Sequence, residues 1–160
     1  MRERLTARVV LLDPADRVLL MKGRLPSRPE GPGAWFTLGG GAEPGESVLD
    51  AAIREVREET GFLEVTFGPV LWLREGVMRL ADDEPVLMKE HYVLARCPGG
   101  EPSRAGWDAN ERRLIDDIRW WSHGDLAVTR DRVFPSGLAG LLSEALTTAP
   151  PDQPRSIAWP

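Results

Sequence analysis

Acidic side chains gather in one stretch of this chain, residues 39–62, whose sequence is GGGAEPGESVLDAAIREVREETGF. In a helix, Glu55 and Glu59 lie one turn apart and Glu58 lies beside them. Like charges at these spacings each cost about 0.2–0.5 kcal/mol in an isolated helix. A hard divalent cation such as Mg²⁺ or Mn²⁺ removes that conflict, because it binds carboxylate oxygens and takes substrate phosphates as further ligands. The stretch therefore predicts a metal site for phosphate chemistry, although a solvated acidic surface has the same pattern.

Start and stop signals for a helix lie within this stretch. The glycines at residues 39–41 permit close approach of the backbone. Ser47, with Asp50 three residues later, resembles a capping box, and Gly61 is suited to the position just after a helix end. The carboxylates are therefore predicted on a short helix with defined ends.

The predicted helix has one apolar side. Leu49, Ala52, Ile53 and Val56 fall within about 100° of arc, which is the width of a face that packs on a core. Ala51 lies between the carboxylates one turn earlier, so the space above them is expected to be open.

The spacing of these residues resembles the Nudix box, Gly-x5-Glu-x7-Arg-Glu-U-x-Glu-Glu-x-Gly-U, in which U is an aliphatic or bulky apolar residue. The match begins with Gly40, Glu46 and Arg54 and continues as REVREETGF to residue 62, with every fixed position filled. Leu38 stands before the glycine pair where the family often has Pro, which changes the stiffness of the loop and not a ligand. The chain thus resembles a Nudix hydrolase, with strand-like segments that extend the likeness from about residue 5 to residue 146.

This resemblance implies an α/β fold, the Nudix-type α/β/α sandwich with a central mixed β-sheet. It implies one domain over residues 1–148 and a Pro-rich tail at 149–160. Sequence patterns alone predict only α/β or α+β. They place strands at 6–12, 17–21, 35–38, 64–73, 86–95 and 118–121, helical segments at 122–126 and 135–146, and an acidic turn at 81–85. The first two strands are expected to form a hairpin, and the last twelve residues to lack regular structure.

The resemblance also assigns roles to the residues of the box. It makes Glu55, Glu58 and Glu59 metal ligands, joined by a backbone carbonyl at Gly39 or Gly40. Arg54 stands four residues before Glu58, where a charge-assisted hydrogen bond can orient the carboxylates. Glu46 is either a further contact to the metal site or an acid stabilised by the helix dipole.

Three acids are candidates for the general base. Glu55 is the first choice, Glu111 the second and Glu90 the third, because family members use either a box glutamate or an acid from a distant loop. For Glu111 and Glu90 the alternative is a solvated surface acid.

Candidate substrate contacts lie outside the box. Arg24, Arg28 and Lys89 are expected to meet phosphates, and Trp35, Trp107 or Tyr92 to stack on a base, although most aromatic side chains belong to a core. Residues 77–80 lack the Pro or Tyr that marks two Nudix subgroups, so the sequence selects no single substrate.

Composition excludes several classes of protein. With 160 residues, a pI near 5.1 and no cluster of Lys or Arg, the chain is expected to bind a small nucleotide and not a nucleic acid polymer. It has no apolar run long enough for a membrane span, its start is unlike a signal peptide, and Cys97 is its only cysteine, so a cytoplasmic protein is expected. Many Nudix proteins are dimers, so the resemblance also allows a homodimer.

The expected function is metal-dependent hydrolysis of a phosphoanhydride in a nucleoside diphosphate that is linked to another group. A Nudix-fold sensor that binds a nucleotide without cleaving it is the alternative, but such modules usually lose box glutamates. An isomerase of the isopentenyl diphosphate type would need a cysteine near the glycine turn, and Cys97 lies elsewhere.

Overall fold

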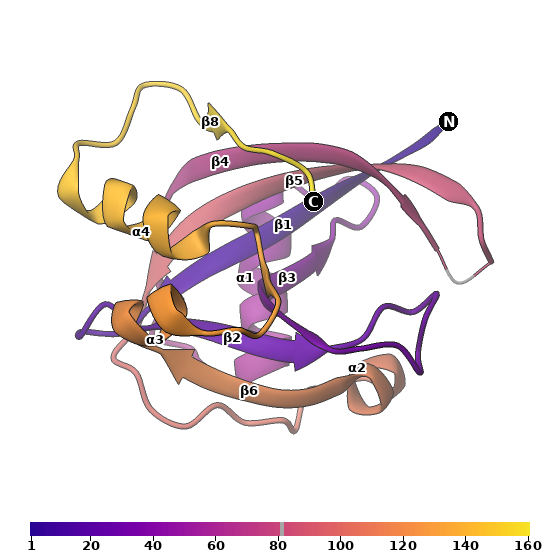
Figure 1. Ribbon diagram of the computed structural model, residues 1–160, viewed down its shortest axis with the longest axis horizontal. Helices are drawn as coiled ribbons and strands as arrows, with labels where there is room; N and C mark the ends of the chain where they lie inside the picture. Colours follow the sequence, from indigo (N-terminus) through magenta and orange to yellow (C-terminus); the bar gives the residue numbers. More distant parts are fainter. Residues whose placement is uncertain (81) are drawn as a thin grey trace.

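The computed structural model describes residues 1–80 and 82–160 (Figure 1). Within these residues it contains eight strands and four helices. The strands are β1 Arg2–Leu12, β2 Val18–Gly23, β3 Ala34–Gly41, β4 Thr66–Arg79, β5 Pro85–Arg96, β6 Ile115–Trp121, β7 Val133–Phe134 and β8 Arg155–Ser156. The helices are α1 Val48–Thr60, α2 Ala109–Leu114, α3 His123–Val128 and α4 Leu138–Thr147. None of the helices in these ranges is both long and apolar enough to cross a bilayer.

All eight strands join one mixed sheet in the order β6-β2-β3-β1-β5-β4-β8, and β7 pairs with β3. Strand β1 is central and runs parallel to β5 from Arg2 to Leu12. The predicted hairpin is wrong in its pairing, because β1 and β2 meet only at Leu12 and Val18. Strand β3 lies between them and pairs with both, which keeps the two strands apart beyond the turn.

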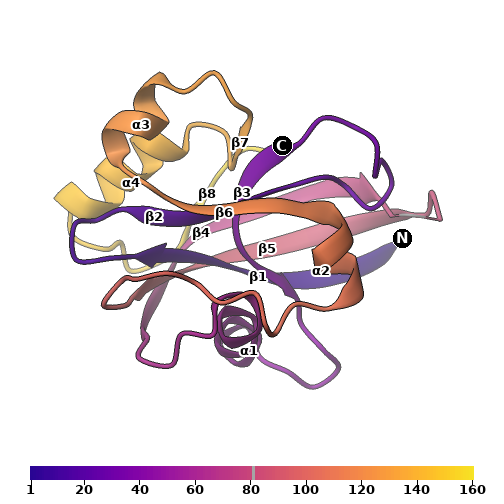
Figure 2. The same cartoon turned by 90° about the horizontal axis from the view of Figure 1, so that it is seen from below.

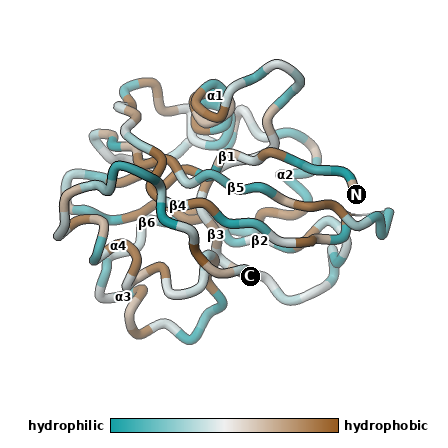
Figure 3. Tube along the Cα trace, turned by 90° about the horizontal axis from the view of Figure 1, so that it is seen from above, coloured by the Kyte–Doolittle hydropathy of each residue, from teal (hydrophilic) through white to brown (hydrophobic). Residues whose placement is uncertain are grey.

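Helices cover both faces of this sheet. Figure 2 shows α1 on one side, with α3 and α4 on the other. Side chains of β1 alternate between the two cores: Val9 and Leu11 pack toward α1, and Val10 and Leu12 pack toward α4. The predicted α/β sandwich with a central mixed sheet is confirmed. The tube of Figure 3 is hydrophilic at the N-terminal end of β1, where charged residues follow one another.

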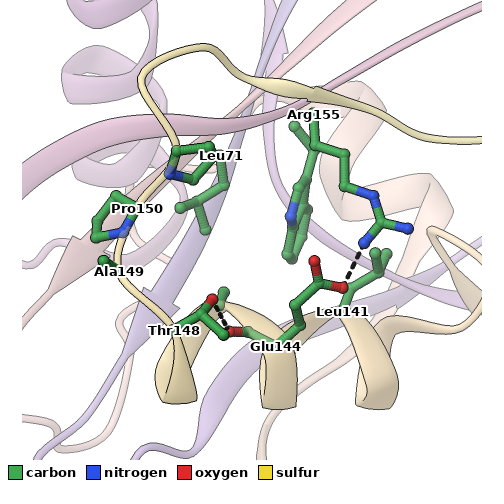
Figure 4. Close-up of a pocket in the computed structure, with 10 residues that line it drawn as sticks. Leu71, Leu141, Glu144, Thr148, Ala149, Pro150 and Arg155 are labelled. Atoms are coloured by element: carbon green, nitrogen blue, oxygen red, sulfur yellow. Dashed lines mark hydrogen bonds and ion pairs between the residues drawn. The ribbon is translucent and has the colours of Figure 1, made fainter.

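The tail differs from the prediction of no regular structure. Strand β8 adds to the sheet beside β4, and Ile157 donates a backbone hydrogen bond of 2.9 Å to Leu73. Between α4, β4 and the tail lies a small pocket lined by Leu71, Leu141 and Pro150, with the ion pair of Glu144 and Arg155 at its edge (Figure 4). The tail is thus held as a strap across β4, because the edge of a sheet supplies unpaired backbone groups. Of the predicted turn at 81–85, residue 81 lies outside the described residues.

Helix α1 has the predicted ends but a different rotation. Ser47 accepts a hydrogen bond from the backbone of Asp50, and Gly61 ends the helix in the left-handed region with φ 74°. Leu49, however, is 48% exposed, whereas Ala51 is fully buried. The predicted apolar face was therefore wrong at Leu49, because the small side chains of Ala51 and Ala52 let the helix approach the sheet on that side.

We expect Leu38→Ala to lower the free energy of unfolding by about 2–5 kcal/mol, because Leu38 is fully buried between β3 and α1. The matched change Leu49→Ala should stay within about 0.5 kcal/mol of the wild type. Urea unfolding of the two variants measures both values. Equal losses would contradict the observed rotation of α1.

Candidate active site

Arg54 gathers the carboxylates of the candidate site. Its guanidinium donates two hydrogen bonds to Glu46, at 2.9 and 2.8 Å, one to Glu55 at 3.0 Å and one to Glu58 at 3.4 Å. A further bond of 3.1 Å reaches the carbonyl of Gly41 at the end of β3. The hydrogen bonds from Arg54 lower the pKa of Glu46 to about 2. One side chain therefore ties the loop before α1, the helix itself and β3 together.

Glu59 is the buried member of the glutamate cluster. It is 5% exposed, and its Oε1 accepts a hydrogen bond of 2.7 Å from the backbone N–H of Gly39. Burial, and then the charge of Glu55, raise the pKa of Glu59 well above its ordinary value. Burial also raises the pKa of Glu55. Folding therefore brings together two carboxylates that burial makes costly to ionise.

The glycines of β3 make room for these carboxylates. A Cβ at residue 40 would lie 2.4 Å from Oε1 of Glu55, so a side chain there would displace that carboxylate from its present position. Gly39 has φ 133°, and a Cβ there would lie 2.0 Å from the carbonyl oxygen of Ala7. The predicted glycine turn is in fact the end of strand β3, which presents its backbone to α1.

Glu111 reaches the cluster from a distant part of the chain. Ser103 donates a backbone hydrogen bond of 2.7 Å to Thr60, and the indole of Trp107 donates one of 2.8 Å to the carbonyl of Glu59. Helix α2 then begins with a capping box between Asp108 and Glu111. The charge of Glu111 contributes to the raised pKa of both Glu55 and Glu59. Of the two distant candidates for the base, Glu111 is therefore beside the cluster.

The other predicted site residues lie in various environments. Arg24 donates hydrogen bonds to the backbone of Pro29 and Arg113 and pairs with Asp116, which fixes the loop before β3. Lys89 pairs with Glu3 at 3.2 Å. The partners of Arg24 and Lys89 therefore lie outside the glutamate cluster.

Three further predicted substrate contacts are Trp35, Tyr92 and Arg28. Trp35 is 3% exposed and donates a hydrogen bond to Asp131. Tyr92 is 1% exposed and donates one of 3.0 Å to Glu90. Both rings belong to the core on the α4 side of the sheet. Arg28 is exposed in the loop between β2 and β3.

The oxygen donors of the cluster suit a hard divalent cation, since Glu55, Glu58 and Glu59 supply carboxylates and β3 supplies backbone carbonyls beside them. Over residues 1–80 and 82–160, no three side chains of His, Cys, Asp or Glu already form a ligand set. The hydrogen bonds of Arg54 to Glu55 and Glu58 hold those carboxylates toward the guanidinium. Each of these carboxylates has a second oxygen, which a cation could bind while Arg54 keeps its hydrogen bond.

A family model for the NUDIX domain matches residues 2–138 of the chain. The chain belongs to the Nudix family. Among curated proteins, the m7GpppN-mRNA hydrolase NUDT17 of Bos taurus is 33% identical over 88 residues, which are 53% of this chain and 29% of that protein. The chain thus spans less than a third of the length of that Nudix relative.

Solved structures show the same Nudix fold. An ADP-ribose pyrophosphatase from Streptococcus suis aligns with a TM-score of 0.63 and 19% identity, covering 96% of this chain and 98% of that one. A MutT NUDIX hydrolase from Burkholderia pseudomallei aligns with a TM-score of 0.57 and 22% identity, covering 91% and 99%. The Nudix resemblance expected from the box is confirmed.

Sequence reasoning missed the surroundings of Glu90. This carboxylate is 2% exposed and accepts hydrogen bonds from Arg74 at 2.7 Å and from Arg8 at 3.4 Å. Burial acts to raise the pKa of Glu90, but the charges of Arg8 and Arg74 outweigh it and lower that pKa. A Nudix base must accept a proton, and this pairing makes Glu90 a poorer acceptor than Glu55 or Glu111. The arginines come from β1 and β4, which only the folded sheet brings together.

Glu59→Gln should leave the metal-free protein as stable as the wild type, or more stable by about 1 kcal/mol, because Gln keeps an acceptor for Gly39 and removes a buried charge. Urea unfolding in EDTA measures the difference. Glu58→Gln is the matched control at an exposed position of the same helix and should change little. A large loss of unfolding free energy for Glu59→Gln, but not for Glu58→Gln, would mean that the buried charge stabilises the fold.

The lowered pKa of Glu90 predicts a dependence of stability on pH. Its folded pKa is below the unfolded value near 4.5, so its contribution is present above that pH and is lost as pH falls through the folded pKa. Glu90→Gln should cost about 3–5 kcal/mol at neutral pH, because it leaves the buried Arg74 without its charge partner. The difference in unfolding free energy between Glu90→Gln and the wild type should become smaller in acid. Urea unfolding at neutral pH and below about pH 4 tests this, and a gap of constant size would contradict it.

Proposed function

We propose that this Nudix protein hydrolyses a phosphoanhydride bond in a nucleoside diphosphate linked to another group, with Mg²⁺ or Mn²⁺. One observation carries the proposal: Glu46, Glu55 and Glu58 converge on Arg54 while Glu59 is buried beside them against Gly39. Like charges gathered around a buried Glu59 are costly to the fold, which favours a role in catalysis.

Glu55, Glu58 and Glu59 would hold the metal ion, with the carbonyl of Gly40 beside them. When bound, a divalent ion spreads the charge of the phosphates and lowers the pKa of water. Arg54 holds Glu55 and Glu58 in a defined orientation from the helix. Its two hydrogen bonds to Glu46 keep the guanidinium in place, which gives Glu46 a supporting role.

The proton of the attacking water needs an acceptor. Glu55 remains the first choice, because burial raises its pKa toward the range in which a carboxylate accepts a proton at neutral pH. Glu111 is the second, since burial raises its pKa too and α2 holds it near Glu59. Separate Glu55→Gln and Glu111→Gln variants distinguish them, because only removal of the true base abolishes the acidic limb of the pH–rate profile, where the rate rises as the base loses its proton.

Small nucleotides are the proposed substrates. One similar protein is named as an ADP-ribose pyrophosphatase, which refers to a small nucleotide, and another as an m7GpppN-mRNA hydrolase, which refers to an mRNA. The acidic pI near 5.1 favours a small molecule over a polymer for this chain. A silent nucleotide sensor is the second candidate, and the intact set of box glutamates weighs against it.

Glu58→Gln and Glu59→Gln should each abolish Mg²⁺-dependent turnover and leave the fold intact, because each removes a proposed ligand charge. The measurement is a screen of nucleotide sugars, ADP-ribose, NADH, dinucleoside polyphosphates, coenzyme A and nucleoside triphosphates with Mg²⁺ or Mn²⁺, read as phosphate after a coupled phosphatase. Asp50→Asn, on an exposed position of the same helix, is the control and should keep wild-type turnover.

Near-normal turnover by both glutamine variants would remove the site assignment. Mg²⁺ should also raise the melting temperature of the wild type and not that of Glu59→Gln, because only the wild type offers the full ligand set. Metal binding without turnover of any compound in the screen would favour the sensor.

A further inference from the structure

A second polar group lies on the opposite face of the sheet from α1, and it consists of Thr6, Arg8, Arg74 and Glu90. We call it the arginine row. Thr6 on β1 and Arg74 on β4 stand opposite Glu90 on β5, one on each side of it. Arg74 pairs with Glu90 at 2.6 Å and Arg8 pairs with it at 3.4 Å. Two guanidinium groups thus share one carboxylate, and the row carries an excess of positive charge.

Two atoms of the arginine row have no partner. Thr6 is 1% exposed and Arg74 is 7% exposed, yet Oγ1 of Thr6 and Nη1 of Arg74 form no hydrogen bond among the described residues. Buried polar atoms without partners are rare, because leaving them unpaired costs free energy. Thr6 and Arg74 stand on the two strands that flank β5, so a ligand with several acceptor oxygens that spans β5 would satisfy both atoms.

Arg4 connects the arginine row to the glutamate cluster. It lies two residues before Thr6 on β1, and a Cβ at Gly41 would be 2.6 Å from its Nε. Burial, and then the charge of Arg8, lower the pKa of Arg4, while Glu55 acts in the opposite direction. Arg4 lies against Gly41 and Glu55 lies against Gly40, so the two side chains reach neighbouring residues of β3.

The strap formed by the tail holds Arg74 in place. The indole of Trp159 lies 4.5 Å from the guanidinium carbon of Arg74, and Tyr92 lies 5.8 Å from that carbon. A Cβ at Gly76 would clash with the Trp159 ring at 2.0 Å, so the ring rests directly on the backbone of β4. Ser136 donates a hydrogen bond of 3.1 Å to the carbonyl of Pro160, which secures the residue after Trp159. Trp159 thus fixes the plane of the guanidinium that carries the unpaired N–H.

We propose that the arginine row binds a phosphate group of the substrate, namely the phosphate farther from the glutamate cluster, and that Trp159 is a positioning residue for Arg74. The identity of the ligand as a nucleoside diphosphate derivative rests on the proposed function. Guanidinium groups match the oxygens of a phosphate through paired N–H donors, and the hydroxyl of Thr6 adds another donor. Glu90 keeps the arginines in place and does not repel the ligand, because Arg8 and Arg74 neutralise its charge.

Isothermal titration calorimetry with ADP and with inorganic pyrophosphate, in EDTA, tests this site without hydrolysis. Thr6→Val removes a hydroxyl that has no partner in the free protein, so its melting temperature should not fall. Its Kd for both probes should nevertheless rise about tenfold, because a hydrogen bond to a charged group is lost. Thr6→Ser keeps the hydroxyl and should bind like the wild type, which separates the loss of the hydrogen bond from a packing defect.

Two further pairs of variants complete the test. Arg8→Gln should raise Kd at least about tenfold, because it removes a charge-assisted bond. Arg79→Gln, on an exposed position of β4 paired with Asp83, is its control and should leave Kd unchanged. Trp159→Ala should weaken binding of both probes, and Trp159→Phe should restore it, because Phe also stacks on a guanidinium.

Unchanged Kd values for Thr6→Val and Arg8→Gln would overturn the inference, and so would the absence of binding of either probe to the wild type. Two outcomes separate failure of this inference from failure of the proposed function. Turnover in the screen with an unchanged KM for Thr6→Val and Arg8→Gln would keep the hydrolase and reject this site. Weakened binding by these variants in EDTA, with no turnover of any compound, would keep this site and reject the hydrolase.

Discussion

The contact of one guanidinium with three carboxylates is the interaction on which the candidate site depends. Arg54 is the only cation that hydrogen-bonds Glu46, Glu55 and Glu58 within the described residues, and it also holds the carbonyl of Gly41. A lysine ammonium could neutralise one charge, but it lacks the planar set of five donors that reaches several acceptors at once. A single side chain therefore links the loop before α1, the helix and the end of β3, in addition to the core between β3 and α1.

Burial of Glu59 shows what this arrangement costs. A carboxylate that is 5% exposed loses most of its hydration, and one backbone N–H from Gly39 offsets only part of that loss. The surrounding core must therefore stabilise the site, and it does so through fully buried residues such as Leu38 and Ala52 between β3 and α1. Catalytic sites commonly carry such a local penalty, because the charges that act on a substrate are unfavourable without it.

Sequence alone predicted the features that depend on neighbouring residues. The helix ends at Ser47 and Gly61 follow from local hydrogen bonding and from a positive φ, and both were found. The rotation of α1 was predicted less well, because periodicity weighs the apolar residue Leu49 and cannot foresee that Glu59 is buried instead. Burial of a charged side chain depends on a partner from another strand, and no local pattern contains that partner.

The features that the sequence did not predict depend on contacts between distant segments of the chain. The approach of Glu111 depends on the loop that crosses α1 and is held by Trp107, about fifty residues from the box. The arginine row depends on the register of β1 against β5 and of β5 against β4, and a shift of one residue would turn Arg8 and Arg74 to the other face. An aromatic residue such as Trp35 or Tyr92 has the same signature in a sequence whether it is core or ligand contact, so only its surroundings tell the two apart.

Strand β3 brings side chains of opposite charge close together. Its glycines at residues 39–41 carry no side chains, so Glu55 approaches the backbone from the α1 side and Arg4 approaches it at Gly41. A diphosphate near the glutamates alone would be repelled, and one near the arginines alone would have no group to activate water. A cation on the acidic side and guanidinium groups on the basic side remove both difficulties, provided that nothing bulkier than hydrogen separates them. A side chain at Gly40 would meet Glu55 and one at Gly41 would meet Arg4, whereas Gly39 leaves room for the backbone of Ala7. Two of the three glycines therefore border charged side chains, and the third serves the packing of β3 on β1.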